Sequence, residues 1–171
     1  MLVPELTRPA QRIGSILRER GETVAVGEGS AGGLISAALL SVPGASAYYL
    51  GGAVIYTAAA ARAWITGAVE APPGMRGATE EFATYLARSA AIRLGATWGI
   101  GEAGAAGPPN RYGDPAGHCW VAVAGPAEAT NLIATGRVER EQNMVAFAAA
   151  ALDLLLDVLG RAVDANGPAS S

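Results

Sequence analysis

Residues 23–40 read TVAVGEGSAGGLISAALL, which is an apolar run, a glycine-rich turn and a second apolar run. The first run predicts a buried strand, and residues 34–40 have the pattern of a helix. A strand, a turn and a helix in this order are typical of α/β proteins, which place ligands at such turns. Four backbone N–H groups at the start of this helix would suit an anionic or carbonyl oxygen, because the turn, residues 27–33, carries few large side chains.

The rest of the chain alternates in the same way. We expect further helices at residues 2–20, 57–65, 79–94 and 139–163, and strands at 48–56, 96–102, 117–124 and 131–135, the last two as a hairpin. Pro9 interrupts the first helix, which is expected to start near it. Thr79 suits an N-cap and Gly95 a C-cap. The order predicts one three-layer α/β/α domain over residues 1–165 with a mixed, mostly parallel sheet, followed by a disordered tail at 166–171.

Composition limits the classes of function. The chain has 171 residues, a net charge of −3 and few aromatic residues, so nucleic acid is a poor candidate partner. Cys119 is the only cysteine and His118 the only histidine, which excludes an internal disulfide and leaves no ligand spacing for a metal. No cofactor is predicted. Charged residues or prolines interrupt every apolar run, and residues 1–20 do not resemble a secretory signal, so we expect a cytoplasmic protein with no membrane partner.

Six short motifs occur in a fixed order along nearly the whole chain. They are Glu-x-x-x-Gly-Gly at 28–33, Pro-Gly-Ala-Ser at 43–46, Val-Ile-Tyr at 54–56, Gly-Ala-Thr-Glu-Glu at 77–81, Gly-x-Ala-Gly-Pro at 104–108 and Pro-x-Gly at 115–117. In this the chain resembles the CinA C-terminal domain family. That family includes bacterial nicotinamide-nucleotide amidases, which hydrolyse nicotinamide mononucleotide to nicotinic acid mononucleotide and ammonia. The resemblance implies the family's fold and a homodimer or higher homo-oligomer.

The chain differs from active members at the residues that do the chemistry. Their first turn reads roughly Ala-Glu-Ser-Cys-Thr-Gly-Gly, and its serine is taken as the nucleophile. With Glu28 aligned, Gly29 occupies that position. The family also has a tyrosine, matched by Tyr56, and a lysine five residues later, where this chain has Ala61. The neighbouring Arg62 cannot replace the lysine as a base, because a guanidinium stays protonated.

Further differences follow the same trend. Ser30 and Ala31 stand where the family has a cysteine and a threonine, and Ala103 replaces a serine of the second loop. Asp114 stands at a common lysine position, and His118 at a threonine position. Amide hydrolysis through a covalent intermediate needs a nucleophile, a base and donors to the oxyanion. The resemblance therefore predicts a member without amidase activity that keeps a cleft for a nucleotide-like small molecule.

An active amidohydrolase, acting on nicotinamide mononucleotide or a related amide, is the alternative. Its candidate catalytic residues are Ser30, as a nucleophile shifted by one position, with Tyr56 or His118. Against this, a serine ahead of a helix is usually a turn or N-cap residue, and Tyr56 can be a strand residue with a hydrated tip. Cys119 cannot pair with His118, because adjacent residues of a strand point to opposite faces. A third possibility is a structural subunit whose pocket is filled by its own side chains.

We expect the first turn and the second loop, residues 104–108, to lie side by side at one edge of the sheet. Together they predict these ligand-binding residues: Glu28, Gly29, Ser30, Ala31, Gly32, Gly33, Tyr56, Gly104, Ala105, Gly107 and Arg111. Besides Ser30 and Tyr56, two more of these residues have a structural alternative. Glu28 could instead bind backbone donors or an arginine within the fold, and Arg111 could be a solvated loop residue.

Overall fold

The computed structural model of the protein describes residues 2–164. Its elements, in chain order, are α1 (Pro4–Arg20), β1 (Val24–Glu28), α2 (Leu34–Leu40), a 3₁₀ turn (Ala45–Ala47), β2 (Tyr49–Val54), α3 (Ala58–Trp64), α4 (Glu80–Leu94), β3 (Trp98–Ala105), β4 (His118–Ala124), β5 (Ala129–Ala134) and α5 (Arg140–Asp164). The domain bounds expected from the sequence, residues 1–165, stay a prediction. The tail predicted at 166–171 lies outside them.

The strands form one mixed sheet in the order β2-β1-β3-β4-β5. β1 pairs with β2 and with β3 in parallel, whereas β3 with β4 and β4 with β5 are antiparallel pairs. Four of the five strands therefore run in one direction. The expected mixed, mostly parallel sheet and the C-terminal hairpin are confirmed.

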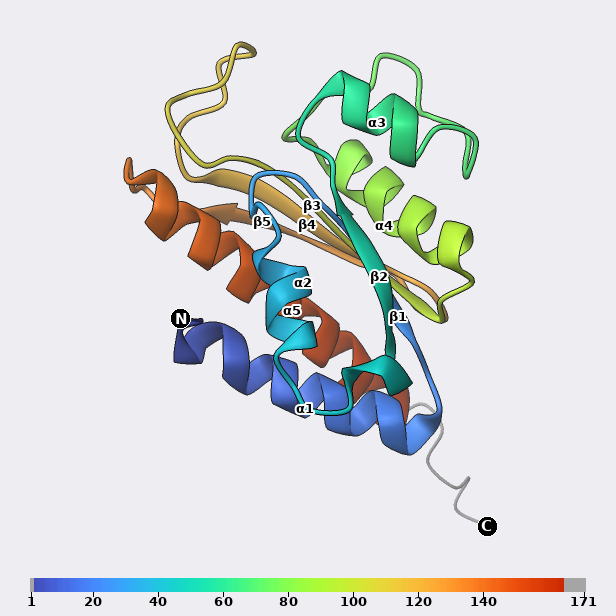
Figure 1. Cartoon of the computed structure of the whole chain (residues 1–171). Coiled ribbons are helices and arrows are strands. Elements are labelled where there is room, and N and C mark those ends of the chain that lie inside the picture. The colour runs from blue at the N-terminus through green and yellow to red at the C-terminus, as the bar shows by residue number, and fades with distance from the viewer. Residues whose placement is uncertain (1, 165–171) are drawn as a thin grey trace.

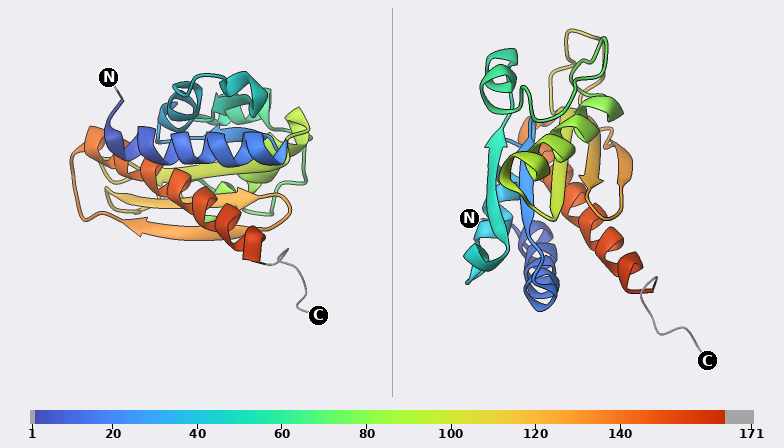
Figure 2. Two further views of the ribbon diagram at one scale, coloured as in Figure 1. Left: turned by 90° about the horizontal axis from the view of Figure 1, so that it is seen from below. Right: turned by 90° about the vertical axis from the view of Figure 1, so that its right-hand side faces the viewer.

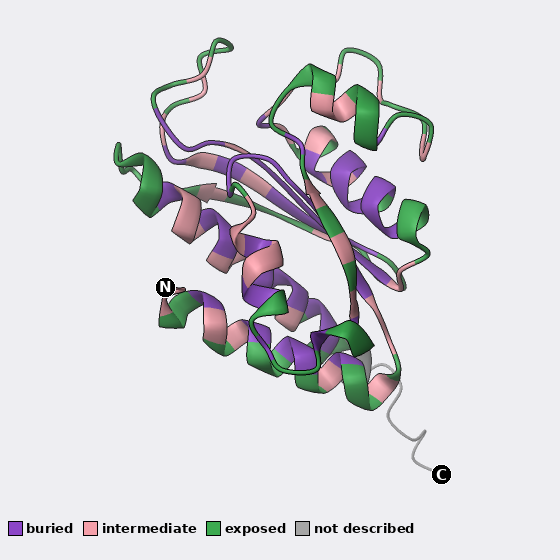
Figure 3. Ribbon diagram, in the orientation of Figure 1, coloured by how far each residue is buried: buried purple, intermediate pink, exposed green. Residues whose placement is uncertain are grey.

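Helices cover both faces of the sheet, which gives the expected three layers (Figures 1 and 2). α1, α2 and α5 cover one face and enclose the larger hydrophobic core, which includes Leu17, Ile35, Trp98 and Leu155. α4 covers the other face over a smaller core centred on Leu86. α3 has no buried residue and lies outside this layer, so it is among the exposed parts of the molecule (Figure 3).

Two glycines allow α4 to lie unusually close to the centre of the sheet. A Cβ atom at Gly99 or Gly101 of β3 would lie less than 2 Å from a main-chain oxygen of α4, that of Ala87 or Ala83 respectively. At these two positions β3 can therefore carry no side chain. The same strand directs its alternate residues, including Glu102, to the opposite face.

The sequence signals predicted the ends of α4 correctly but not the start of α1. Thr79 caps α4 by accepting from the backbone N–H of Phe82, and Gly95 ends the helix in the left-handed conformation, as expected. The expected start of α1 near Pro9 is wrong, because the helix begins at Pro4 and continues through Pro9. Burial of residues on both sides of the proline, including Leu6 and Ile13, outweighs the hydrogen bond that Pro9 cannot donate.

α5 is long and apolar enough to cross a membrane by length and composition alone, over Arg140–Arg161. In the fold it packs against α1 and α2 and against the sheet. Its Phe147, Leu152 and Leu155 side chains are fully buried in the larger core. We interpret it as the core helix of the domain.

Candidate functional site

The first glycine-rich turn binds two carboxylates of the chain itself. Glu28, at the end of β1, lies beside Glu102 of β3 in the parallel register, and both side chains are fully buried. The Glu28 carboxylate accepts hydrogen bonds from the backbone N–H groups of Gly33 (2.9 Å), Ile35 (3.1 Å) and Ser36 (3.0 Å), and from the Ser36 hydroxyl (2.6 Å). Glu28 thus binds backbone donors at the start of α2, which is the structural alternative considered from the sequence.

Glu102 binds the other half of the same turn. Its Oε2 atom accepts from the backbone N–H groups of Gly29 (2.9 Å) and Ala31 (2.8 Å). Its Oε1 atom accepts from the Ser30 hydroxyl (2.5 Å) and from the Cys119 thiol (3.3 Å). Sequence reasoning missed Glu102. The signal that could have identified it is a single carboxylate inside an otherwise apolar strand, because a buried charge requires several partners.

Burial dominates the electrostatics of Glu102. Loss of water raises the pKa of its carboxyl group, the hydrogen bonds from Ser30, Ala31 and Cys119 lower it, and the nearby Glu28 charge raises it further, with a net shift upward from the ordinary value of 4.5. The same environment raises the pKa of the Cys119 thiol well above its usual range, through burial first and then through Glu102. Cys119 is therefore a protonated thiol and a poor nucleophile.

Because of these bonds, most N–H groups of the turn are not free for a ligand, contrary to what the sequence suggested. Most of the donors expected to receive a ligand oxygen are used by Glu28 and Glu102, while the N–H groups of Gly32 and Leu34 bond to carbonyl groups within the turn. An outside anion would therefore have to displace one of the two carboxylates. Nothing in this geometry requires a ligand to hold the turn in place.

The candidate catalytic residues do not come together. Ser30 is only 6% exposed, and its hydroxyl points to Glu102, not to Tyr56 or His118. Ser30 lies in the turn and is not the N-cap of α2, which is Gly33. The His118 ring bonds to the carbonyl of Ala78 (3.1 Å), on the other side of the sheet from Cys119. The expected separation of His118 from Cys119 is confirmed, whereas a pairing of Ser30 with Tyr56 or His118 is not found.

Tyr56 lies at the surface, where Arg140 joins it to the second loop. The Tyr56 side chain is 62% exposed, and its hydroxyl accepts from Nη2 of Arg140 (3.0 Å). Nη1 of Arg140 donates to the carbonyl of Gly107 (2.5 Å), and the guanidinium lies 5.8 Å from the centre of the Tyr56 ring. Within residues 2–164, no carboxylate forms an ion pair with Arg140. Sequence reasoning missed Arg140, which nothing in its local pattern distinguishes from other arginines.

The two glycine-rich loops are side by side, as expected. Gly104 and Ala105 belong to the end of β3, where they pair with Cys119 and His118. A Cβ atom at Gly104 would lie 2.8 Å from both the Ser30 hydroxyl and the Cys119 Cβ atom. Glycine at this position is what allows the first turn to pack directly on β3.

The other positions singled out from the sequence are peripheral or offer little room. Arg111 is exposed, and its guanidinium stacks on the ring of Tyr112, as expected for a loop residue. Asp114 forms an ion pair with Arg76. At Gly29, a Cβ atom would lie 3.3 Å from the carbonyl oxygen of Glu102, so a serine there would be tightly packed. Within the described chain, no three His, Cys, Asp or Glu side chains gather to hold a metal ion.

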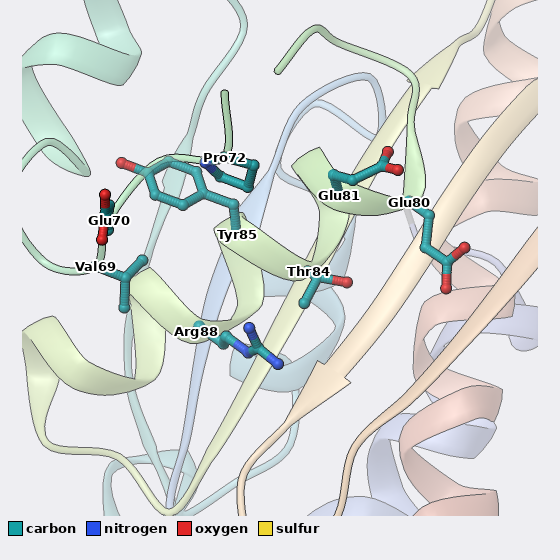
Figure 4. Close-up of a pocket in the computed structure, with 8 residues that line it drawn as sticks. All are labelled: Val69, Glu70, Pro72, Glu80, Glu81, Thr84, Tyr85 and Arg88. Atoms are coloured by element: carbon teal, nitrogen blue, oxygen red, sulfur yellow. The ribbon is translucent and has the colours of Figure 1, made fainter. Parts of the chain in front are cut away.

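A separate cavity of about 500 Å³ lies beside α4, away from both glycine-rich loops (Figure 4). Three carboxylates line it, those of Glu70, Glu80 and Glu81, together with Arg88. The charge of Arg88 is already used in a two-bond ion pair with Glu128, at 2.9 and 2.7 Å. This cavity contains none of the residues that the sequence predicted for a site.

Stability should depend on pH through Glu102. Because burial raises its folded-state pKa, the group stabilises the fold fully below about pH 4.5, and this contribution is lost as the pH rises through the shifted pKa. We expect the wild type to lose stability relative to Glu102→Gln from pH 4 towards pH 8, by at most about 1.4 kcal/mol per pH unit. Urea denaturation of both proteins at each pH measures the difference. A difference that stays constant or grows in favour of the wild type would contradict the prediction.

Comparison with known proteins identifies the family. The family model of the CinA C-terminal domain matches residues 6–159. A CinA-like protein of Anaeromyxobacter dehalogenans is 39% identical over 141 residues, which is 81% of this chain and 34% of that protein. A CinA-like protein of Salinibacter ruber is 37% identical over 143 residues, with 82% and 34% covered. The chain thus spans about a third of the length of these relatives.

Solved structures give the same assignment of fold. The competence/damage inducible protein CihA from Agrobacterium tumefaciens superposes with a TM-score of 0.83 at 26% identity, covering 94% of this chain and 98% of that one. A CinA superfamily protein from Escherichia coli superposes with a TM-score of 0.82 at 21% identity, over 92% and 94% of the two chains. At that identity the second comparison supports the fold alone.

Proposed function

Since the chain belongs to the CinA C-terminal domain family, we propose that it is a member that binds an anionic, nucleotide-like small molecule without hydrolysing it. One observation supports the loss of hydrolysis above all others. Gly29 and Ala61 stand where the resemblance places the nucleophile and the lysine, and the backbone donors of the turn are bound to Glu28 and Glu102. The positions that the resemblance gives to the nucleophile and the base thus carry neither group, and most of the turn's oxyanion donors already have acceptors within the chain.

The binding part of the proposal depends on Arg140. Its guanidinium lies where Tyr56 meets the second loop, and both of its hydrogen bonds go to neutral oxygen atoms. The positive charge is therefore not neutralised by a carboxylate, and three of the five N–H groups of a guanidinium remain for an incoming group. Phosphate oxygens match this donor geometry. A homo-oligomer and a cytoplasmic location stay predictions.

The second candidate function is the amidase that acts through Ser30. The observation that favours it is the hydrogen bond from the Ser30 hydroxyl to Glu102, since a neighbouring carboxylate with a raised pKa could take the proton of a nucleophile. Burial of Ser30 argues against it, because a substrate amide would have to reach a side chain that is 6% exposed.

One set of measurements separates the two. We expect the wild type to release no more ammonia from nicotinamide mononucleotide than Ser30→Ala does, and no electrophilic serine probe to label Ser30. We expect calorimetric titration with nicotinamide mononucleotide to show binding that Arg140→Gln weakens about tenfold or more, because a charge-assisted contact is lost.

Arg137→Gln is the matched control, since Arg137 is another exposed arginine just ahead of α5, with no hydrogen bond from its guanidinium to Tyr56 or Gly107. Ammonia release that disappears in Ser30→Ala would reject the proposed loss of activity. Equal binding by wild type and Arg140→Gln would reject the role of Arg140.

A further inference from the structure

A second cavity lies between α3, α4 and the edge strand β2. It has a volume of about 190 Å³ and a mostly apolar lining. Its walls come from the glycine pair of β2, Gly51 and Gly52, from Trp64 of α3, and from Ala90 and Leu94 of α4. In Figure 1 the three elements border one another on the right-hand side. Tyr56, Gly107 and Arg140 are not among the residues that line the cavity. The cavity is therefore distinct from the region where Tyr56 meets the second loop.

One polar group in this cavity has no partner. The Ser89 side chain lines the cavity and is fully buried, and its hydroxyl makes no hydrogen bond to any described residue. A serine inside a helix either points its hydroxyl to solvent or donates to the carbonyl group four residues earlier. A buried hydroxyl without a partner destabilises a fold, so its presence here needs an explanation. A ligand atom that accepts from Ser89 would supply one.

Arg93 gives the cavity a positive charge. It lies four residues after Ser89, on the same side of α4, and lines the same cavity. Its Nη2 atom donates to the carbonyl of Thr66 (2.8 Å), and no carboxylate in the described chain pairs with it. A guanidinium has further N–H groups available. The Cβ atoms of residues four apart on a helix lie about 5–6 Å from each other. A single carboxylate could therefore accept hydrogen bonds from both the Ser89 and the Arg93 side chains.

Apolar surface at the opening completes the recognition chemistry. Trp64, Leu94 and Leu50 line the cavity and are 59%, 45% and 41% exposed. Large apolar side chains gathered around a cavity mark ligand sites, because a ligand removes their surface from water. An apolar cavity of about 150 Å³ is enough to hold a benzene ring. The volume here suits one ring, or a short alkyl chain, with one small polar substituent.

We propose that this cavity binds a small carboxylic acid with an apolar body, such as an aromatic ring. The carboxylate accepts from the Ser89 hydroxyl and the Arg93 guanidinium, and the apolar body lies against Trp64 and the glycine pair of β2. The site is independent of the proposed nucleotide-binding region, since the two share no residue.

Benzoate, with benzyl alcohol as its uncharged counterpart, is the probe. We expect benzoate to shift the backbone amide NMR signals of residues 50–53 and 89–94, and to bind at least tenfold more tightly than benzyl alcohol. Ser89→Ala and Arg93→Gln should each weaken benzoate binding, Arg93→Gln about tenfold. Ala90→Leu should abolish binding by filling the cavity.

Ile92→Ala is the control, because Ile92 is exposed on α4 and does not line the cavity; it should bind benzoate as the wild type does. Thermal unfolding of each variant checks that it folds. If Ala90→Leu does not fold, Ser89→Ala and Arg93→Gln still test the proposal. If benzoate does not shift the amide signals of residues 50–53 and 89–94, the proposal is overturned. Equal binding of benzoate by the wild type, Ser89→Ala and Arg93→Gln, or equal binding of the two probes, would also overturn it.

Discussion

Gly101→Ala is expected to destabilise the protein by about 3 kcal/mol or more. The added Cβ atom would lie 1.8 Å from the main-chain oxygen of Ala83 and 2.7 Å from the main-chain nitrogen of Ala87. These are backbone atoms of α4, so no side chain can rotate away, and the helix must move off the sheet. That movement would open the smaller core, where Leu86 is fully buried. Urea denaturation followed by circular dichroism measures the loss.

Gly160→Ala is the control for this substitution. Gly160 lies in α5, and a Cβ atom there would meet nothing within 4 Å. Alanine has the higher helix propensity, so this variant should gain about 0.5–1 kcal/mol. The same chemical change would thus act in opposite directions at the two positions. Similar unfolding midpoints for Gly101→Ala and the wild type would show that α4 does not rest on β3 as closely as described.

Glu28→Ala is the other substitution with a large expected effect, again about 3 kcal/mol or more. It removes the acceptor for three backbone N–H groups and one hydroxyl at the start of α2, all within a site where the Glu28 side chain is fully buried. Unpaired donors that stay buried each carry a desolvation cost, which makes the loss larger than that of one ordinary hydrogen bond. Glu28→Gln should lose less stability than Glu28→Ala, because its amide oxygen still accepts hydrogen bonds. It should still lose some, because its NH₂ group would face other donors.

The loss is measured by urea denaturation, and hydrogen exchange at the amides of Gly33, Ile35 and Ser36 locates it. Glu5→Ala is the matched control: Glu5 is exposed in the first turn of α1, where a carboxylate contributes only about 0.3–1 kcal/mol through the helix dipole. If Glu28→Ala and Glu5→Ala unfold at the same urea concentration, Glu28 is not the structural anchor of the turn.

Local sequence signals were enough for most of the elements. The capping threonine and glycine of α4 predicted both of its ends, and the apolar run 34–40 predicted α2 to the residue. Such signals work because the hydrogen bonds that end a helix are made within a few residues. The prediction near Pro9 missed because burial along the whole of α1 outweighed a local preference of one residue.

The site was less predictable, because its hydrogen bonds join residues that are far apart in the sequence. Glu102 binds Gly29, Ser30 and Ala31 across more than seventy residues, and Arg140 reaches Tyr56 across 84. The resemblance predicts the positions where chemical groups are missing, but it could not show which side chains lie around the turn. The partner of Ser30, in particular, could not be inferred from the turn in which it lies.

The sequence by itself determined the α/β architecture, the place of the glycine-rich turns and the family, because periodicity, caps and ordered motifs are properties of contiguous residues. Only the tertiary structure decided what the turns bind. β1 and β3 pair in parallel with Glu28 opposite Glu102, so the two carboxylates come to lie side by side beneath the turn and accept hydrogen bonds from its N–H groups. The physical reason is that a buried carboxylate must find donors, and which donors lie within reach depends on strand pairing.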